Sequence, residues 1–220
     1  MNLSVKRLLQ LAAATTLVTA FAIAFIDAPM ARLLDRQLDP VVGDAMLWVI
    51  DWPALFWLHK WGSLFVLGVI VLGLLISPRH RHYGPQLLAL VALHVGCRLL
   101  VNEMKGLSGR VRPSEWLKTD GSHMFWFDRS SAVAFPSGHT TQFASIFLPL
   151  ATFFALPRWA TYMCVVVPFV VGLARILQNA HFVSDVTGAV AVCAALTAAA
   201  KSLGAWAHPW LSARLTKNPR

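Results

Sequence analysis

Charged residues are scarce in this chain: they make up 13% of its 220 residues, whereas 57% are hydrophobic. Because soluble globular domains carry about 25% charged residues, this composition excludes an ordinary soluble domain. The mean hydropathy of +0.60 is typical of a protein with several membrane-spanning segments.

Cysteine is also rare, with only three residues in the chain. Cys97, Cys164 and Cys193 each lie within an apolar run and lack the spacing of metal ligands. This excludes a disulfide framework and a cysteine metal site, and it favours a packing function. The chain also lacks internal repeats and low-complexity tracts, so we expect one integral-membrane domain over residues 1–220.

Long apolar runs predict an all-α, polytopic membrane protein. A bilayer is crossed by about 20 apolar residues in a helix, and the runs predict about six transmembrane helices. Two runs, Gly62–Ser77 and Thr141–Leu156, are short for a span. The others are Leu8–Ile26, Gln86–Met104, Trp159–Leu177 and Val183–Ala207.

Basic residues between the runs predict the orientation, because short loops rich in Lys and Arg stay in the cytoplasm. Such residues alternate with the runs, so both termini are expected in the cytoplasm. They include Lys6, Arg7, Arg79, Arg81, Arg158, Arg214, Lys217 and Arg220. The connection 105–139 then faces outward, which in a bacterial inner membrane is the periplasm.

Residues 27–60 carry charges too often to be a span, yet they are rich in aromatic and aliphatic residues near Trp48 and Trp57. We interpret them as an amphipathic segment on the outer face, between the first two spans. An ordinary packing helix outside the membrane is an equal alternative. The first run is interpreted as a retained helix rather than a cleaved signal, since no small-residue cleavage site follows it.

Three polar blocks interrupt the apolar chain within about residues 100–190. They are KGLSGRVRP at 105–113, PSGH at 136–139 and RILQNAHFVSD at 175–185. Together they supply the cations Lys105, Arg112 and Arg175, two histidines, one carboxylate and a Ser-Gly turn, which is the chemistry needed to bind and cleave a phosphate ester.

The order and spacing of these blocks resemble the type 2 phosphatidic acid phosphatase superfamily, in particular its membrane lipid phosphatases. One departure is Ala174, where the family usually has Ser before the third-block Arg175. We expect this change to tune activity rather than abolish it. The resemblance implies hydrolysis of a lipid phosphomonoester or pyrophosphate through a phosphohistidine intermediate.

The two histidines are expected to have different catalytic functions. As the resemblance implies, His181 attacks phosphorus as the nucleophile, while Asp185, four residues later, orients its ring. His139 then remains as the general acid for the leaving group and the base that activates water.

Phosphate binding is expected from the cations and from the start of a helix. Lys105, Arg112 and Arg175 provide charge, Ser137 a hydroxyl donor, and Gly138 a backbone amide. Because Asp185 is committed to His181 and cations already fill the site, we expect no metal ion and no cofactor.

A polar stripe of His94, Arg98 and Asn102 recurs every four residues and leads to Lys105. Arg98 and Asn102 are therefore candidates for a polar wall beneath the phosphate or along the substrate path. Hydrogen bonding between helices, without a functional task, explains the stripe equally well.

A lipid phosphate is the expected substrate, because aromatic residues flank an outward-facing site. The candidates that the family resemblance suggests are phosphatidylglycerol phosphate, phosphatidic acid, diacylglycerol pyrophosphate, undecaprenyl pyrophosphate and lipid A phosphates. Additional cations favour a headgroup with more than one phosphate, or are merely solvated. The aromatic residues are Trp116, Phe125, Trp126 and Phe127, and the cations are Arg110, Lys118 and Arg129.

Two other functions use the same residues: a lipid phosphotransferase, and a non-catalytic protein that binds or transports lipid phosphates. A haloperoxidase is disfavoured because those relatives are soluble. We expect membrane lipids as partners, no nucleic acid, and no obligate protein partner.

Overall fold

The computed structural model describes residues 2–37, 41–51, 68–69, 71–74, 76–77, 81–119, 126–127 and 133–216. Every named element in these residues is helical, and one isolated antiparallel bridge joins Val111 to Val133. The all-α prediction is therefore confirmed for the described part of the chain.

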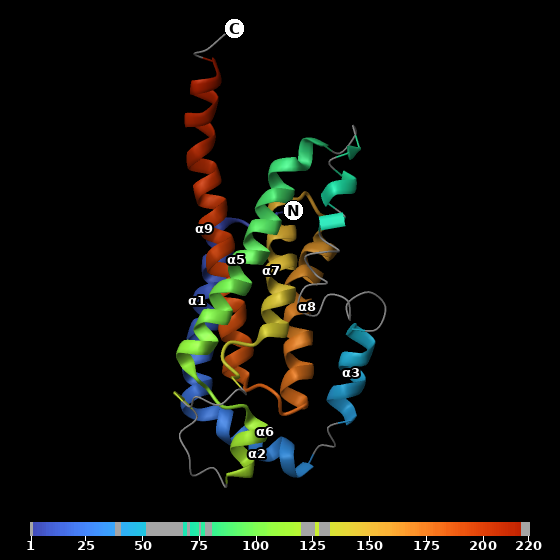
Figure 1. Ribbon diagram of the computed structural model, residues 1–220, viewed down its shortest axis with the longest axis vertical. Coiled ribbons are helices and arrows are strands. Elements are labelled where there is room, and N and C mark those ends of the chain that lie inside the picture. Colours follow the sequence, from blue (N-terminus) through green and yellow to red (C-terminus); the bar gives the residue numbers. More distant parts are fainter. Residues whose placement is uncertain are drawn as a thin grey trace.

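The helices follow in chain order (Figure 1). A π-helical turn over Ala22–Ile26 joins Val5–Phe21 to Asp27–Gln37, and a 3₁₀ turn over Arg81–Tyr83 leads into the helix that begins at Gly84. The helices are α1 (Val5–Phe21), α2 (Asp27–Gln37), α3 (Val41–Asp51), α5 (Gly84–Ser108), α6 (Pro113–Lys118), α7 (Gly138–Phe153), α8 (Arg158–Leu177) and α9 (Val183–Thr216).

Four helical stretches in the described residues are long and apolar enough to cross a membrane: Val5–Gln37, Gly84–Ser108, Arg158–Leu177 and Val183–Gly204. The run at Thr141–Leu156 corresponds to α7, which has only 16 residues. Half of the run at Gly62–Ser77 lies outside the described residues, so the count of six stays a prediction. The amphipathic segment 27–60 likewise stays a prediction, although α2 and α3 lie within it.

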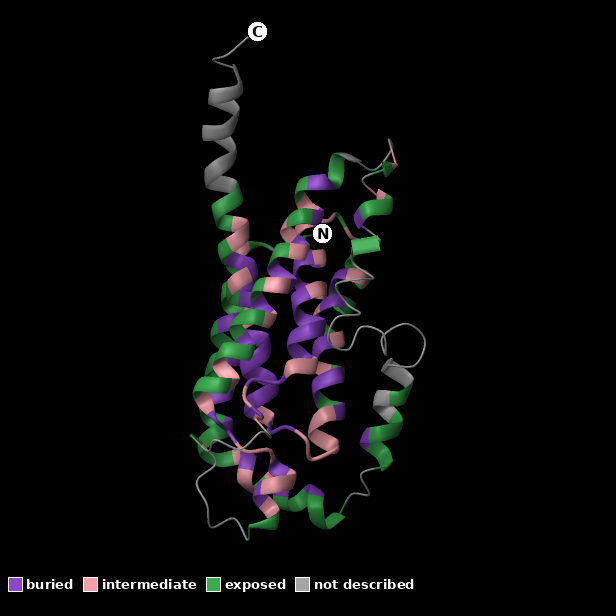
Figure 2. Cartoon of the chain, viewed as in Figure 1, coloured by how far each residue is buried: buried purple, intermediate pink, exposed green. Residues whose placement is uncertain are grey.

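Helix α7 lies at the centre of the bundle and packs against α5, α8 and α9, while α1 runs along α9. Figure 2 shows buried residues concentrated on α7 and α9 and exposed residues on the outer helices. The outward surface carries large apolar side chains, among them Leu17, Phe25, Leu99 and Trp159. Such a surface fits a lipid environment, and the chain is an integral membrane protein.

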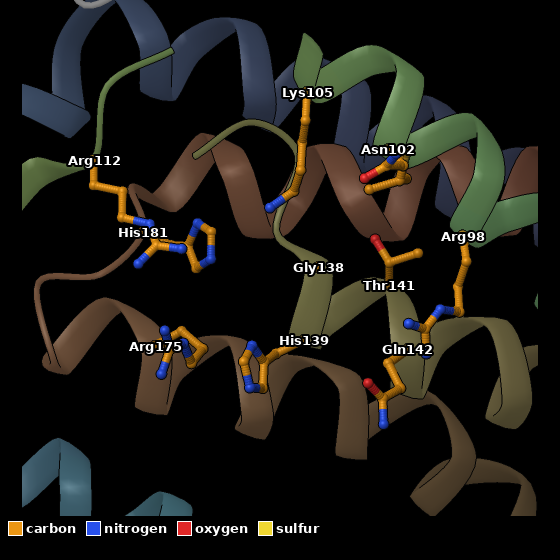
Figure 3. A pocket seen from close by; sticks show the side chains of 11 residues that line it. Arg98, Asn102, Lys105, Arg112, Gly138, His139, Thr141, Gln142, Arg175 and His181 are labelled. Atoms are coloured by element: carbon orange, nitrogen blue, oxygen red, sulfur yellow. The ribbon is translucent and has the colours of Figure 1, made fainter. Parts of the chain in front are cut away.

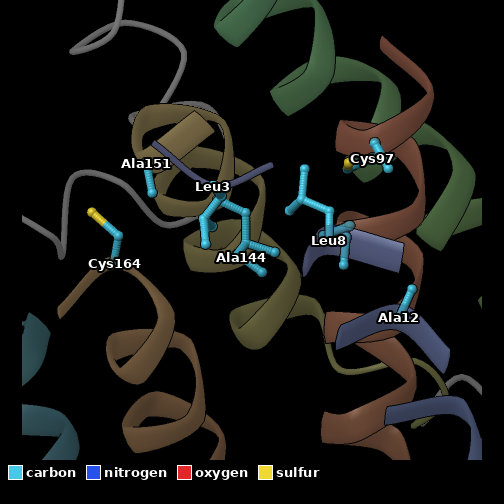
Figure 4. Close-up of a cluster of buried hydrophobic side chains, with 11 residues drawn as sticks. Leu3, Leu8, Ala12, Cys97, Ala144, Ala151 and Cys164 are labelled. Carbon is cyan, nitrogen blue, oxygen red and sulfur yellow. The ribbon is translucent and has the colours of Figure 1, made fainter. Parts of the chain in front are cut away.

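Small residues line the main apolar core, where α1, α5, α7, α8 and α9 approach one another (Figure 4). Ala12, Ala144 and Ala151 are buried there, and small side chains allow helix backbones to pack closely. The three cysteines also lie buried in this core as free thiols, as expected for packing residues.

The connections that carry the polar blocks all meet at one end of the bundle, near α2 and α6 (Figure 1). The start of α1 lies at the other end, where Leu3 N donates to Ala151 O at 2.9 Å and Lys201 Nζ donates to Leu3 O at 2.7 Å. The polar blocks and the chain's N-terminal end are thus separated by the length of the bundle.

Candidate active site

A cavity of about 310 Å³ opens at the end of the bundle where α5, α7 and α8 meet the connection into α9. Figure 3 shows side chains from all of these segments directed into it. Its lining residues are Arg98, Val101, Asn102, Lys105, Arg112, Gly138, His139, Thr141, Gln142, Arg175 and His181. Residues from all three polar blocks are therefore brought together in one pocket.

Backbone hydrogen bonds hold the three blocks in place. Ser137 N donates to Asp185 O at 2.9 Å, which joins the second block to the third. Ser114 N donates to Asn179 O at 3.1 Å, which ties the segment after Arg112 to the third block. These bonds fix blocks that are far apart in sequence without using the side chains that face the cavity.

Three cations approach the cavity from three different segments. Lys105 lies in the last turn of α5, Arg112 precedes α6, and Arg175 lies in the last turn of α8. Gly109, with φ of 50°, ends α5 in a left-handed conformation and lets the chain turn toward Arg112. Their convergence creates a strongly positive pocket suited to a phosphate group.

One cationic atom has a particular need for an anion. The Nε atom of Arg112 is buried and has no hydrogen-bond partner among the described residues. Buried polar atoms are almost always satisfied, so an acceptor oxygen from a bound phosphate would complete its hydrogen bonding.

The start of α7 forms another side of the cavity. Ser137 is the N-cap residue and accepts from Thr140 N at 3.4 Å, so Gly138 and His139 form the first positions of the helix. A Cβ atom at residue 138 would lie 3.6 Å from Lys105 Nζ. The glycine thus keeps the backbone open to a ligand at the positive end of a helix.

His181 lies across the cavity and is almost entirely buried. Its Nδ1 lies 3.4 Å from Asp185 Oδ2, a long contact that links the ring to the carboxylate. Burial lowers the pKa of His181 to about 4; the positive charges of Lys105 and Arg175 act in the same direction, and Asp185 opposes them. The neutral ring, with its Nδ1 proton toward Asp185, leaves an Nε2 lone pair for nucleophilic attack.

Two predicted site residues do not line the cavity. Asp185 lies behind His181, as an orienting group should. Ser137, in contrast, was expected to donate its hydroxyl to phosphate, but its side chain is fully buried in the helix cap and also accepts from Thr140 Oγ1 at 3.1 Å. Gly138 supplies the surface next to the cavity, and donation by the Ser137 hydroxyl stays a prediction.

Some lining residues were not anticipated from the sequence. Thr141 and Gln142 extend the cavity along α7, three and four residues after Gly138, and helical spacing from the second block was the available signal. Arg98 and Asn102 lie opposite them on α5 (Figure 3), so the predicted polar stripe does reach the cavity.

The expectation that Arg110 offers an additional exposed cation is wrong. Its side chain has 0% exposure and forms ion pairs with Asp27 and Asp185. Lys118 is exposed, with its ammonium group paired to Glu115 at 3.0 Å, and Arg129 lies outside the described residues. Arg110 therefore cannot bind a second phosphate.

The aromatic residues expected at the membrane interface have different environments. Trp116 is buried against Ala31 and Phe182, Trp126 covers the Arg110 guanidinium, and Phe127 is 78% exposed. Phe125 lies outside the described residues. Of Trp116, Trp126 and Phe127, only Phe127 is exposed enough to contact lipid directly.

No group of three or more His, Cys, Asp or Glu side chains that could hold a metal ion is found in the described residues. The cavity side chains that bear charge are cationic, and the nearest carboxylate is bonded to His181 and Arg110. The prediction of metal-independent chemistry remains to be tested by experiment.

Comparison with known proteins gives one match. The sequence profile of the PAP2 superfamily matches residues 84–208. No curated protein and no solved structure matches the chain. The matched segment runs from α5 to α9 and contains every residue that lines the cavity, whereas α1, α2 and α3 lie outside it.

Proposed function

This chain belongs to the PAP2 superfamily, and we propose that it hydrolyses a phosphomonoester or pyrophosphate of a lipid without a metal ion. The observation that carries the proposal is the joint presence, in one cavity, of the three cations Lys105, Arg112 and Arg175 and of two histidines, with a carboxylate behind His181. PAP2 proteins are generally phosphatases, and the cavity supports that activity here.

Binding of the phosphate uses the cationic side of the cavity. The non-bridging oxygens accept hydrogen bonds from Lys105, Arg112 and Arg175, and one oxygen lies at the positive end of α7 beside Gly138. Phosphoryl transfer is catalysed mainly by positioning and by charge stabilisation. These fixed donors stabilise the additional charge that develops on the oxygens in the transition state.

In the first chemical step, His181 Nε2 attacks phosphorus in line with the leaving oxygen. The N–P bond forms while the P–O bond to the lipid breaks, and His139 donates a proton to that oxygen. The carboxylate of Asp185 accepts the Nδ1 hydrogen bond and stabilises the positive charge that the ring acquires. The products are the lipid alcohol, or the lipid monophosphate from a pyrophosphate, and a phosphohistidine.

In the second step, His139 has lost its proton and acts as a base. It removes a proton from water, the water oxygen attacks phosphorus, and the P–N bond breaks. Inorganic phosphate leaves, and both histidines return to their starting states. The same two groups thus exchange acid and base functions within one cycle.

A lipid substrate is supported by the position of the cavity at the end of apolar helices whose outer surface is hydrophobic. The alternation of basic loops supports an outer, periplasmic cavity with both termini in the cytoplasm of a bacterial inner membrane. A phosphate in water, with its tails in the bilayer, can then reach the cavity from the outer leaflet.

The test is phosphate release by detergent-purified wild type and His181→Ala protein, in excess chelator, from a panel of lipid phosphates and pyrophosphates. Release by the wild type alone supports the proposed enzyme and ranks its substrates. Transfer of the phosphoryl group to an added lipid alcohol would indicate a transferase. Tight binding without turnover of any panel member would indicate a binding or transport protein.

A further inference from the structure

Arg110 is the largest fully buried side chain among the described residues. Its guanidinium carbon lies 4.2 Å from the ring centroid of Phe182 and 4.4 Å from that of Trp126. Aromatic faces attract cations, most strongly where water is excluded. The group is therefore held in a fixed position between two rings, away from the phosphate cavity.

The two terminal nitrogens of Arg110 bind two different carboxylates. Its Nη1 donates to Asp185 Oδ1 at 2.6 Å, and its Nη2 donates to Asp27 Oδ2 at 2.7 Å. Both carboxylate side chains are also completely buried. One guanidinium thus bridges the carboxylate behind His181 and an acidic residue 83 positions earlier in the chain.

Asp27 is fixed from a second direction. It is the first residue of α2, and its Oδ1 accepts from Ser184 N at 3.1 Å, in the first turn of α9. The Ser184 hydroxyl bridges the groups, since it donates to Asp27 Oδ2 and accepts from Arg110 Nη1 at 2.5 Å. Asp27 therefore caps the helix that carries Asp185.

The Asp185 carboxylate has little freedom to rotate in this arrangement. Arg110 occupies Oδ1, while Oδ2 accepts from Phe182 N at 2.8 Å and faces His181 Nδ1 at 3.4 Å. A fixed carboxylate determines both the orientation and the tautomer of the histidine beside it. The position of the nucleophile thus depends on Arg110.

The charges of Asp27, Arg110 and Asp185 together set the electrostatic environment of His181. Arg110 alone would neutralise Asp185 and weaken its attraction for a positive His181 ring. Asp27 supplies a second negative charge, so the three groups together keep one net negative charge behind His181. In a buried site such a charge acts strongly on its neighbour.

We infer that Asp27 and Arg110 are positioning residues for the nucleophile: they fix the Asp185 carboxylate and preserve its net negative charge toward His181. This inference rests on the proposed function, since it assigns them to the same phosphoryl transfer. Asp27 lies outside the segment matched by the family, residues 84–208, so the first helices of this chain take part in its chemistry.

The test compares Asp27→Asn with Asp35→Asn. Asp35 lies on the same helix but is exposed, so its substitution makes the same change in charge away from the site. We would measure kcat and KM for dioctanoyl phosphatidic acid in detergent, over a range of pH, together with the melting temperature. The substrate binds through Lys105, Arg112 and Arg175, which neither substitution touches.

For Asp27→Asn we expect kcat to fall about 10- to 100-fold, the loss typical when a group that orients a catalytic ligand is removed. KM should change less than about twofold. Because a negative charge near His181 is lost while Lys105, Arg112 and Arg175 remain, titration of His181 moves to lower pH. Asp35→Asn should match the wild type in kcat, in KM and in the titration of His181.

An unchanged kcat in folded Asp27→Asn protein would overturn the inference, as would a rise in KM with kcat preserved. Where Asp27→Asn lowers the yield of folded protein, Ser184→Ala provides the second test, because it retains all three charges and removes only the bridging hydroxyl. It should lower kcat without moving the His181 titration, and a wild-type kcat would count against the inference.

Titration of His181 by NMR, assigned with His181→Ala, separates this inference from the proposed function. If the wild type hydrolyses no substrate, the proposed function fails, yet the Asp27→Asn titration still reports the charge behind His181. An unmoved titration in Asp27→Asn would overturn the inference even where the wild type is an active phosphatase.

Discussion

Arg110 and Arg112 are two residues apart, yet they have opposite surroundings. Arg110 is completely buried and binds two carboxylates, whereas Arg112 lines the cavity. The first has its charge more than neutralised by the protein. The second keeps its charge available for a ligand.

The comparison shows that the acidic partners of an arginine, rather than its place in a motif, determine what it does. A buried cation with carboxylate partners stabilises the arrangement of the protein, because separating the charges would leave them unpaired. A cation that faces a cavity can stabilise an anion that arrives from outside. Substitutions at the two positions should therefore affect different measurements.

The largest effect on stability is expected for Arg110→Met. It would leave Asp27 and Asp185 buried without their cation, and breaking a buried ion pair in this way costs about 3–5 kcal/mol. Unfolding of the protein in detergent, followed by circular dichroism, measures the change. Lys118→Met is the control, since the Lys118 side chain is 69% exposed and its ion pair should contribute at most about 1 kcal/mol.

Arg112→Met should change activity rather than stability. Removing one donor from a site of developing negative charge typically lowers the rate about 10²- to 10³-fold, while the free energy of unfolding should change by about 0.5 kcal/mol or less. Phosphate release and unfolding, measured on the same preparation, check both parts. An Arg112→Met variant with full activity would contradict the proposal that Arg112 acts on the ligand while Arg110 stabilises the protein.

The pH dependence of stability should report the protonation of His181, which lies between the cavity cations and the buried carboxylate of Asp185. Its pKa is about 4 in the folded protein, against 6.5 for an ordinary histidine, with burial as the main cause. The unfolded chain therefore binds the additional proton first, and the stability contributed by neutral His181 is lost as the pH falls from about 6.5 to about 4.

His181→Gln provides the comparison for this prediction, because it removes the titrating group and keeps a polar side chain. Melting temperatures of wild type and variant, measured across the same pH values, should differ in slope below about pH 6.5. Parallel slopes would mean that His181 is protonated at its ordinary pKa. Such a result would count against a neutral His181 as the nucleophile.

Several cavity residues could be predicted from the sequence because they lie in three short blocks of fixed spacing. Lys105, Arg112, His139, Arg175 and His181 do meet in one cavity. The apolar runs also predicted helices close to those observed: the run Trp159–Leu177, for example, corresponds to α8 at Arg158–Leu177. Both predictions depend on residues that are close together in sequence, and the spacing of such residues within a block or a helix does not depend on how distant parts of the chain pack.

The Asp27 to Arg110 ion pair could not be predicted, because no sequence pattern near either residue indicates that the two are in contact. Asp27 follows an apolar run and has the pattern of a solvated charge at a membrane boundary. Arg110 lies among other cations and has the pattern of a surface residue. Only the packing of α2 against α6 and the start of α9 brings them together.

The smallest effect is expected for Gly138→Ala, which tests how closely a ligand approaches the pocket cations. The new methyl group would lie 3.6 Å from Lys105 Nζ, an ordinary contact distance, so the fold should tolerate it. It would occupy space beside the start of α7, and we expect KM for the lipid phosphate to rise about threefold with little change in kcat. Gly106→Ala is the matched control, because a Cβ there has no neighbour within 4 Å. If both variants bind substrate equally well, the phosphate does not contact the start of α7, and the cations Lys105, Arg112 and Arg175 bind it without help from the backbone.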